Sequence, residues 1–177
     1  LVGMSTACVK AWLTMNGVAE SSVKFVEMPP TTAIPALQRG TVDICLLSEP
    51  FVTFGKGDVR SVGAPYDAAA VKTPGKTFCF SVWYAAKSWI NADPARAKRA
   101  LDAIYETARW ANSHHDATFD ILVRDGKLDP DKARGMLRTV YATSLTPDLV
   151  QPALDVAMQN KMFTKSVDAS SLITKIS

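Results

Sequence analysis

The sequence of 177 residues lacks long apolar runs and the short motifs that identify many enzymes. Every apolar run is interrupted by a charged residue, Pro or Gly before it reaches the roughly 18 residues that a membrane-spanning helix needs. The glycine-rich loops GxGxxG and GxxxxGKS/T, which bind nucleotide phosphates, are absent, and so is the nucleophile motif GxSxG. We therefore expect no membrane-spanning helix, and the support for an enzyme is weak.

Cysteine and histidine are scarce, with three and two residues respectively. Cys8, Cys45 and Cys79 lie in apolar segments, with no CxxC pair and no His at the spacing of metal ligands. We expect these cysteines to be small buried hydrophobic residues. His114 and His115 follow a predicted helix without a third ligand at a suitable spacing, so we expect both at the surface. The sequence predicts neither a metal site nor a bound cofactor.

Charge is also modest, since 20 Lys and Arg residues stand against 17 Asp and Glu residues and give a net charge of +3. The basic residues are scattered along the chain rather than gathered in one run, which argues against a nucleic-acid partner or a membrane-surface patch. Hydrophobic residues make up 47% of the sequence, which is typical of a globular protein. The length permits one domain or two small lobes.

The first half of the chain alternates between strand-like and helix-like patterns of apolar residues, which is typical of βαβ units with a parallel sheet. The expected elements end at residues that break regular structure, namely Asn-Gly, Pro-Pro and Gly. We predict strands at residues 1–4, 23–28 and 42–47, helices at 5–15 and 32–39, and a short helix that ends near Gly55. The expected fold class is therefore α/β.

The second half is mainly helical after one apolar strand at residues 78–85, which follows a connector at 61–76. Three helix starts place a capping side chain before Pro, at Asp93, Asp129 and Thr146. We predict helices at 94–113, 116–124 and 147–160, a helix start at Pro130 and a last turn near Asp168. A single strand cannot cover so many apolar helix faces, so we expect further strands from a segment before Leu1, where the chain begins without Met or a leader.

Polar residues and Pro follow the three strands of the first half at their carboxyl ends. In a parallel sheet these ends meet at one edge, where ligands of open α/β sheets bind. Ser5 and Thr6 offer hydroxyl groups at a helix N-terminus, which suits an anion or a carbonyl oxygen, and Glu49 offers a carboxylate for a ligand with a donor group. We therefore predict a small polar ligand at Ser5, Thr6, Pro29 and Glu49.

Each of these residues also has a structural interpretation. Ser5 or Thr6 suits a helix N-cap, Pro29 suits a rigid turn, and Glu49 suits the first turn of a short helix. Trp83 and Tyr84, near the end of the fourth predicted strand, are candidates for stacking on a ligand, but aromatic residues in strands are more often part of the core. The pattern leaves both interpretations open.

Several segments resemble the solute-binding proteins of ABC importers that capture nitrate, sulfonates, taurine and thiamine-precursor pyrimidines. The resemblance lies in VKAWLTMNGV at 9–18, VKFVEMP at 23–29, ALQRGTVD at 36–43 and SEPFVT at 48–53. The combination of ALxxGxVD with EPF is fairly specific. The C-terminal segments YATSL at 141–145, VQPALD at 150–155 and VDA at 167–169 are similar to the family's last helices.

The resemblance implies a type II periplasmic-binding fold, in which two α/β lobes close on a ligand. Residues 1–72 are then expected in lobe two, and residues 73–177 supply a hinge strand and the C-terminal helical part of lobe one, whose N-terminal part is missing. On this basis Ser5, Thr6 and Glu49 lie on one wall of the ligand cleft.

The function that the resemblance implies is the capture of a small polar or anionic solute for a membrane permease of the ABC type. We expect a monomeric binding protein without enzymatic activity, located in the periplasm or held outside the cell by a lipid anchor. Two alternatives stay open. Thiamine-pyrimidine synthases are similar but carry a Cys-rich iron-binding run that this chain lacks, and the effector domains of LysR-type regulators share the fold.

Overall fold

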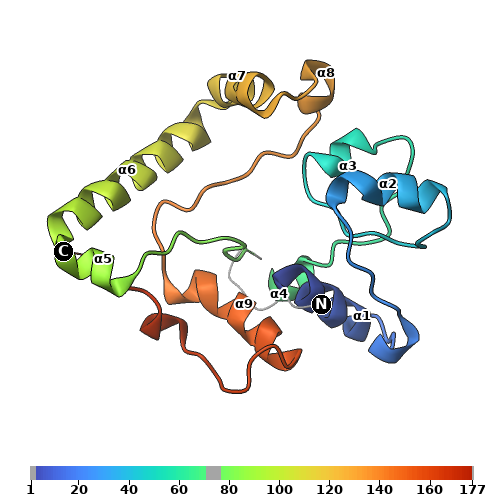
Figure 1. Cartoon of the computed structure of the whole chain (residues 1–177), viewed down its shortest axis with the longest axis horizontal. Coiled ribbons are helices and arrows are strands. Elements are labelled where there is room, and N and C mark those ends of the chain that lie inside the picture. Colours follow the sequence, from blue (N-terminus) through green and yellow to red (C-terminus); the bar gives the residue numbers. More distant parts are fainter. Residues whose placement is uncertain (1–2, 71–76, 177) are drawn as a thin grey trace. The chain divides into compact units, whose positions relative to one another are not determined.

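The computed structural model describes residues 3–70 and 77–176 of the chain (Figure 1). The described residues form two compact units. Unit 1 comprises residues 19–64 and 114–139, and unit 2 comprises residues 3–18, 65–70, 77–113 and 140–176. This grouping differs from the predicted lobes 1–72 and 73–177, because residues 114–139 associate with residues 19–64. The predicted lobes stay a prediction.

Helices are the regular elements of both units (Figure 1). Unit 1 contains η1 (Glu20–Ser22), α2 (Pro30–Gln38), α3 (Phe51–Phe54), α7 (His115–Gly126) and α8 (Pro130–Ala133). Unit 2 contains α1 (Met4–Met15), α4 (Asp67–Ala70), α5 (Lys87–Ala92), α6 (Pro94–Ser113), α9 (Pro147–Gln159) and η3 (Ala169–Ser171).

The predicted strands are the main point at which the structure and the sequence patterns differ. Within residues 3–70 and 77–176 there is no β-strand, and an isolated parallel bridge joins Lys56 and Val59. Residues 23–28, 42–47 and 78–85 are irregular chain instead. A strand is stable only beside another strand that completes its hydrogen bonds, and within the described ranges no second strand pairs with these segments. The structure therefore does not confirm the α/β class.

The first predicted strand also differs, because helix α1 already begins at Met4. Residues 1 and 2 of that predicted strand lie outside the described residues. Likewise α2 begins at Pro30, two residues before the predicted start at residue 32, so that Pro35 lies inside the helix. The connector predicted at 61–76 contains α4 in its described part, and α5 occupies a stretch for which the sequence predicted no element.

Acidic side chains cap three helices, and two of them, Asp93 and Asp129, precede Pro as the sequence analysis predicted. Asp93 Oδ1 accepts a hydrogen bond of 2.9 Å from the Arg96 amide at the start of α6. Asp129 Oδ1 accepts from two backbone amides of α8, and Asp168 accepts from one amide of η3. Thr146 is the exception, because its side chain caps no amide of α9. These bonds satisfy N–H groups that have no partner inside the helix.

Helix α6 confirms its predicted bounds, and its apolar side chains form one face along it. Ala97 and Ala108 on this face are buried, and Leu101, Ile104, Tyr105 and Ala111 are half-buried. The 3.6-residue period of an α-helix places these six side chains on one side, and burial of that side stabilises the helix. The opposite side carries charged residues, including an exposed ion pair between Lys98 and Asp102.

The core of unit 2 forms where α1, α4 and α9 contact one another. Ala7, Cys8 and Val156 are its buried members, and partly buried side chains pack around them from Met4, Ala11, Tyr66, Phe78 and Met162. Across the described residues most buried hydrophobic side chains are alanine methyl groups, with Leu13 and Val156 as the larger aliphatic ones. This packing holds the first turn of α1 against the start of α4.

Candidate functional site

The predicted ligand residues Ser5 and Thr6 lie within the first turn of α1. The residue that caps this helix is Gly3, which offers no side chain, so the alternative that Ser5 or Thr6 is the N-cap is wrong. The first intrahelical bond runs from the Ala7 amide to the Gly3 carbonyl over 3.1 Å. The amides before Ala7 have no partner inside α1, and an anion placed there would interact favourably with them and with the helix dipole.

The Ser5 hydroxyl lies next to a second hydroxyl that sequence analysis did not predict. Ser5 Oγ and Tyr66 Oη are 3.1 Å apart, and either atom can donate the hydrogen bond. Whichever hydroxyl donates, the other keeps its own hydrogen for a third partner. Both residues are half-buried, and the Tyr66 ring packs edge-on against Phe80 with centroids 4.9 Å apart. The pair thus presents an O–H donor near the N-terminus of α1.

Tyr66 could not be found from the sequence because residues 61–76 lack a periodic pattern of apolar residues. Its position depends on a contact between α1 and α4, which are about 60 residues apart along the chain. No local signal encodes a contact of this kind.

Trp83 and Tyr84 belong to the same unit as Ser5 and Thr6, in the irregular segment before α5. Their side chains are 81% and 93% exposed, so the alternative that they are core residues is wrong. Phe80 of the same segment is also more than half exposed. Exposed aromatic side chains that lie close together along the chain are a feature of binding surfaces.

Glu49 lies in unit 1, just before α3, and its carboxylate is engaged within that unit. Oε2 accepts from the Thr53 amide over 3.1 Å and Oε1 accepts from the Thr53 hydroxyl over 2.9 Å. Oε1 also accepts from the amide of Leu137 over 3.3 Å. Glu49 precedes the N-cap residue Pro50, so the interpretation that it lies in the first turn of the helix is wrong. Its carboxylate nevertheless accepts hydrogen bonds from Thr53 of α3 and from the distant Leu137 amide.

Pro29 also lies in unit 1, where it precedes α2 as the N-cap residue. Its carbonyl oxygen accepts hydrogen bonds from the amide and the hydroxyl of Thr32, over 3.0 and 2.9 Å. Its side chain is exposed. This geometry is that of a rigid helix start. The structure therefore places Pro29 and Glu49 in one unit and the other four predicted site residues in the other.

The three cysteines are free thiols, and burial raises the pKa of each. The effect is largest for Cys8, which is fully buried and whose pKa rises to about 11. This confirms the prediction for Cys8, whereas Cys45 and Cys79 are only half-buried. Thiols with raised pKa values are protonated at neutral pH, which makes them weak nucleophiles and weak metal ligands.

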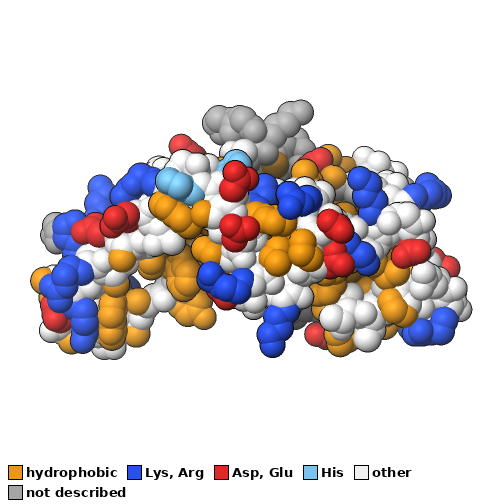
Figure 2. All heavy atoms as spheres, turned by 90° about the horizontal axis from the view of Figure 1, so that it is seen from above, with side chains coloured by type: hydrophobic (Ala, Val, Ile, Leu, Met, Phe, Trp, Pro, Cys, Tyr) orange, Lys and Arg blue, Asp and Glu red, His pale blue; other side chains and the backbone are white. Residues whose placement is uncertain are grey.

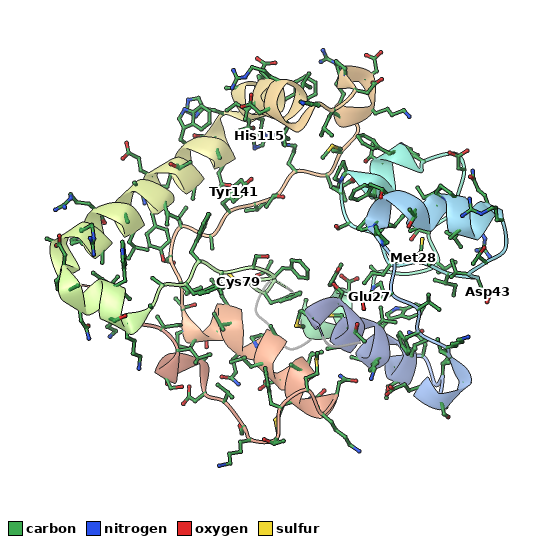
Figure 3. The ribbon with its side chains drawn as sticks, viewed as in Figure 1. Glu27, Met28, Asp43, Cys79, His115 and Tyr141 are labelled. Atoms are coloured by element: carbon green, nitrogen blue, oxygen red, sulfur yellow. The ribbon has the colours of Figure 1, made fainter. Side chains whose placement is uncertain are left out.

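Metal-binding side chains do not gather in the described chain. No three side chains of His, Cys, Asp or Glu within residues 3–70 and 77–176 are arranged to hold a metal ion. His114 and His115 are exposed, as predicted, at the junction between α6 and α7 (His115 is labelled in Figure 3).

The surface carries charges of both signs. On the face seen in Figure 2, basic and acidic side chains alternate, with hydrophobic side chains between them. This distribution agrees with the scattered charges of the sequence. In the part of the chain that the structure describes, no helix has the length and the apolar composition required to cross a bilayer.

Comparison with known proteins gives one family match. The family described as NMT1/THI5 like matches residues 1–118, which is two thirds of the chain. The match includes all six predicted ligand residues and the segments that carry the resemblance in the first half, and it ends within α7. The resemblance of residues 141–169 lies outside it and stays a prediction. No curated protein and no solved structure matches the chain.

Proposed function

The chain belongs to the NMT1/THI5-like family, and on that premise we propose that it captures a small solute for an ABC importer. The family comprises solute-binding proteins for nitrate, sulfonates and taurine together with thiamine-precursor proteins, and it implies a type II periplasmic-binding fold. In this proposal the protein works outside the cytoplasm as a monomer, binds its ligand without chemical turnover and delivers it to a membrane permease. Family membership is the observation that carries the proposal.

The ligand class that we propose is a small anion or an anionic organic molecule, such as nitrate, a sulfonate or taurine. The support comes from the start of α1, where amides without an intrahelical partner lie close to the paired hydroxyls of Ser5 and Tyr66. Amide and hydroxyl groups donate hydrogen bonds to anionic oxygens, and the positive end of the helix dipole adds to the attraction. Thr6 of the same turn is a third donor in this proposal.

The remaining predicted ligand residues, Pro29, Glu49, Trp83 and Tyr84, stay predictions. Glu49 has a structural role that competes with ligand binding, because its carboxylate already accepts bonds from Thr53 and Leu137. Trp83 and Tyr84 are accessible to a ligand with an apolar or aromatic part. A thiamine-precursor pyrimidine is therefore the second ligand class to test.

The proposal is tested by thermal shift and calorimetry on the 177-residue chain with nitrate, taurine, ethanesulfonate and the thiamine-precursor pyrimidine. A ligand at 100 times its Kd stabilises the native state by about 2.7 kcal/mol, which corresponds to a rise in Tm of roughly 5–10 °C for a chain of this size. We expect this shift from at least one anionic compound. Solute binding of this class is refuted if none of the four compounds raises the Tm.

The site itself is tested with Tyr66→Phe, which removes the hydroxyl and keeps the ring that packs on Phe80. We expect the affinity for the anionic ligand to fall about tenfold, the equivalent of about 1.4 kcal/mol. Tyr105→Phe is the matched control, because it makes the same chemical change on the apolar face of α6. Equal affinities in the two variants would refute the site and leave the solute-binding function in place.

A further inference from the structure

Residues 80–89 of unit 2 form an exposed segment that is rich in aromatic side chains. Every residue in this range is exposed, and Trp83, Tyr84 and Trp89 are 81%, 93% and 39% exposed respectively. Val82 between them is an exposed aliphatic residue. Monomeric proteins rarely leave several large apolar side chains together in water unless the surface binds a partner. This segment is therefore a candidate interaction surface.

Few contacts join the segment to the rest of unit 2. At its start, the Cys79 amide donates to the Leu149 carbonyl over 2.7 Å, and the Phe80 ring packs edge-on against Tyr66. From residue 81 to residue 85, no hydrogen bond or ring contact is assigned in the described part of the chain. The aromatic side chains in this stretch can therefore contact another surface without losing a bond within the unit.

Basic side chains lie where this segment enters α5, which contacts the beginning of α6 (Figure 1). The Arg96 guanidinium lies over the Trp89 ring, with Cζ 4.8 Å from the ring centroid, and Nη2 donates to the Trp89 carbonyl over 3.4 Å. This contact places the first turn of α6 beside α5. Lys87, the first residue of α5, and Arg99, about one turn beyond Arg96, thus belong to the same corner of unit 2.

Positive charge exceeds negative charge at this corner. Residues 80–105 contain four basic side chains and two acidic ones, which gives a net charge of +2. Both acidic side chains are already engaged, because Asp93 accepts from the Arg96 amide over 2.9 Å and Asp102 pairs with Lys98 over 3.1 Å. The corner therefore presents an excess of positive charge to solvent.

A stripe along α6 continues the same surface. Residues three or four positions apart lie on one side of a helix. The stripe that begins at Arg96 consists of exposed residues and includes a second arginine and another partly exposed tryptophan, namely Arg99, Ala103, Thr107 and Trp110. The acidic residues of α6 lie outside this stripe. The corner thus combines aromatic and basic side chains without a carboxylate between them.

We propose that this aromatic–basic patch binds the surface of a bilayer that contains anionic phospholipid. Its members are Trp83, Tyr84, Lys87, Trp89, Arg96 and Arg99. Trp and Tyr side chains favour the headgroup region, where an apolar ring meets lipid and its polar group meets water. Lys and Arg side chains are attracted to the anionic headgroups, and each strengthens binding about fivefold.

The composition of the patch favours lipid over single-stranded nucleic acid. An aliphatic side chain such as Val82 gains from the acyl boundary but offers no ring for a base to stack on. A net charge of +2 is also small for a site that depends on many phosphate contacts. The scattered basic residues of the sequence predicted no such patch, whereas the contact between Arg96 and Trp89 gathers several of them. The inference requires no bound solute, so it can fail separately from the solute-binding proposal.

Sedimentation with lipid vesicles tests the proposal on the 177-residue chain. We expect the chain to pellet with vesicles made of equal parts phosphatidylcholine and phosphatidylglycerol, and several-fold less with vesicles of phosphatidylcholine alone. A rise in NaCl from about 0.1 M to 1 M shortens the Debye length from about 10 Å to 3 Å and should weaken binding to the mixed vesicles. Absence of binding to the mixed vesicles, or equal binding to both kinds, overturns the proposal.

The aromatic half of the patch is tested with the double variant Trp83→Ser and Tyr84→Ser. Both side chains are exposed in irregular chain, so their loss should leave the circular dichroism spectrum unchanged. We expect affinity for the mixed vesicles to fall at least tenfold, since two interfacial rings are removed. Leu137→Ser is the matched control, because Leu137 is also 81% exposed but belongs to unit 1. Equal affinities in the double variant and the control overturn the proposal.

The basic half is tested with Arg99→Gln, which removes an exposed charge that has no ion pair assigned in the described chain. We expect binding to the mixed vesicles to weaken about fivefold. Arg60→Gln makes the same change at an exposed position of unit 1 and should have no effect. Equal binding by the two variants overturns the proposal. A thymidine oligonucleotide that displaces the chain from the vesicles, with an affinity that Arg99→Gln and the double variant also reduce, would make the patch a nucleic-acid site and overturn it as well.

Discussion

Replacement of Glu49 separates the structural role that its contacts show from the ligand role that the sequence predicted. Glu49→Ala removes the acceptor for the Thr53 amide, the Thr53 hydroxyl and the Leu137 amide at once. The first two bonds hold the start of α3, and the third joins this start to the end of the 114–139 segment. All of these contacts lie within unit 1, so we expect Glu49→Ala to lower the stability of that unit.

The magnitude follows from the kind of bond that is lost. Removal of an N-terminal capping side chain costs about 0.5–2 kcal/mol. The Leu137 amide adds little, because its bond is long at 3.3 Å and the residue is exposed, so that water can replace the carboxylate. We therefore expect Glu49→Ala to lower the free energy of unfolding by about 1–2 kcal/mol, or the Tm by roughly 2–8 °C. Glu49→Gln keeps one carbonyl oxygen and should lose about half as much.

Urea unfolding followed by circular dichroism measures this difference, with Glu27→Ala as the matched control. Glu27 is an exposed carboxylate of the same unit, and no bond or contact of its side chain is assigned. Its removal should change stability by less than about 0.5 kcal/mol. The reasoning is refuted if Glu49→Ala and Glu27→Ala unfold at the same urea concentration. If Glu49→Ala instead binds ligand at least tenfold more weakly without losing stability, the ligand role is correct.

Two further results are expected. Burial raises the pKa of Cys8 from 9.0 to about 11, so the folded state holds this proton more tightly than the unfolded state, and stability should fall as the pH rises from about 9 to 11. The decrease is at most about 1.4 kcal/mol per pH unit. Chemical unfolding curves of Cys8→Ala, measured over the same pH range, should lack this decrease. Asp129→Ala removes the acceptor for two amides of α8 and should cost about 1 kcal/mol, whereas Asp131→Ala, two residues further on in the first turn of α8, serves as the control in thermal melts. An equal loss in both Asp variants would contradict the capping role of Asp129.

Local signals in the sequence predicted the helices of the second half well. An Asp before Pro at 93 and 129 gave the helix starts, because a short acidic side chain satisfies the first amides and Pro needs no amide partner there. The apolar spacing of α6 gave its bounds and its buried side. Thr146 followed the same pattern, but its hydroxyl makes no capping bond, so the position of the helix was right and the reason for it was wrong.

The predicted strands and the predicted site depended on contacts that no local signal fixes. Apolar stretches at 23–28, 42–47 and 78–85 are suited to strands, yet a strand forms only if another segment lies beside it. The proposed gathering of Ser5 with Glu49 relied on such a sheet, whereas the structure assigns them to different units. The Tyr66 hydroxyl beside Ser5 is likewise a product of tertiary packing.

Alanine methyl groups fill most buried positions of the described chain, and they determine which substitutions these positions tolerate. Ala7 and Ala169 have no exposed surface, so a larger side chain at either position would overlap its neighbours at a cost of about 1–3 kcal/mol. Replacement of Ala7 by Gly would weaken α1 by about 1 kcal/mol. Both larger and smaller side chains at these buried positions thus lower the stability. We expect substitutions that raise the Tm to lie at solvent-facing positions of the helices.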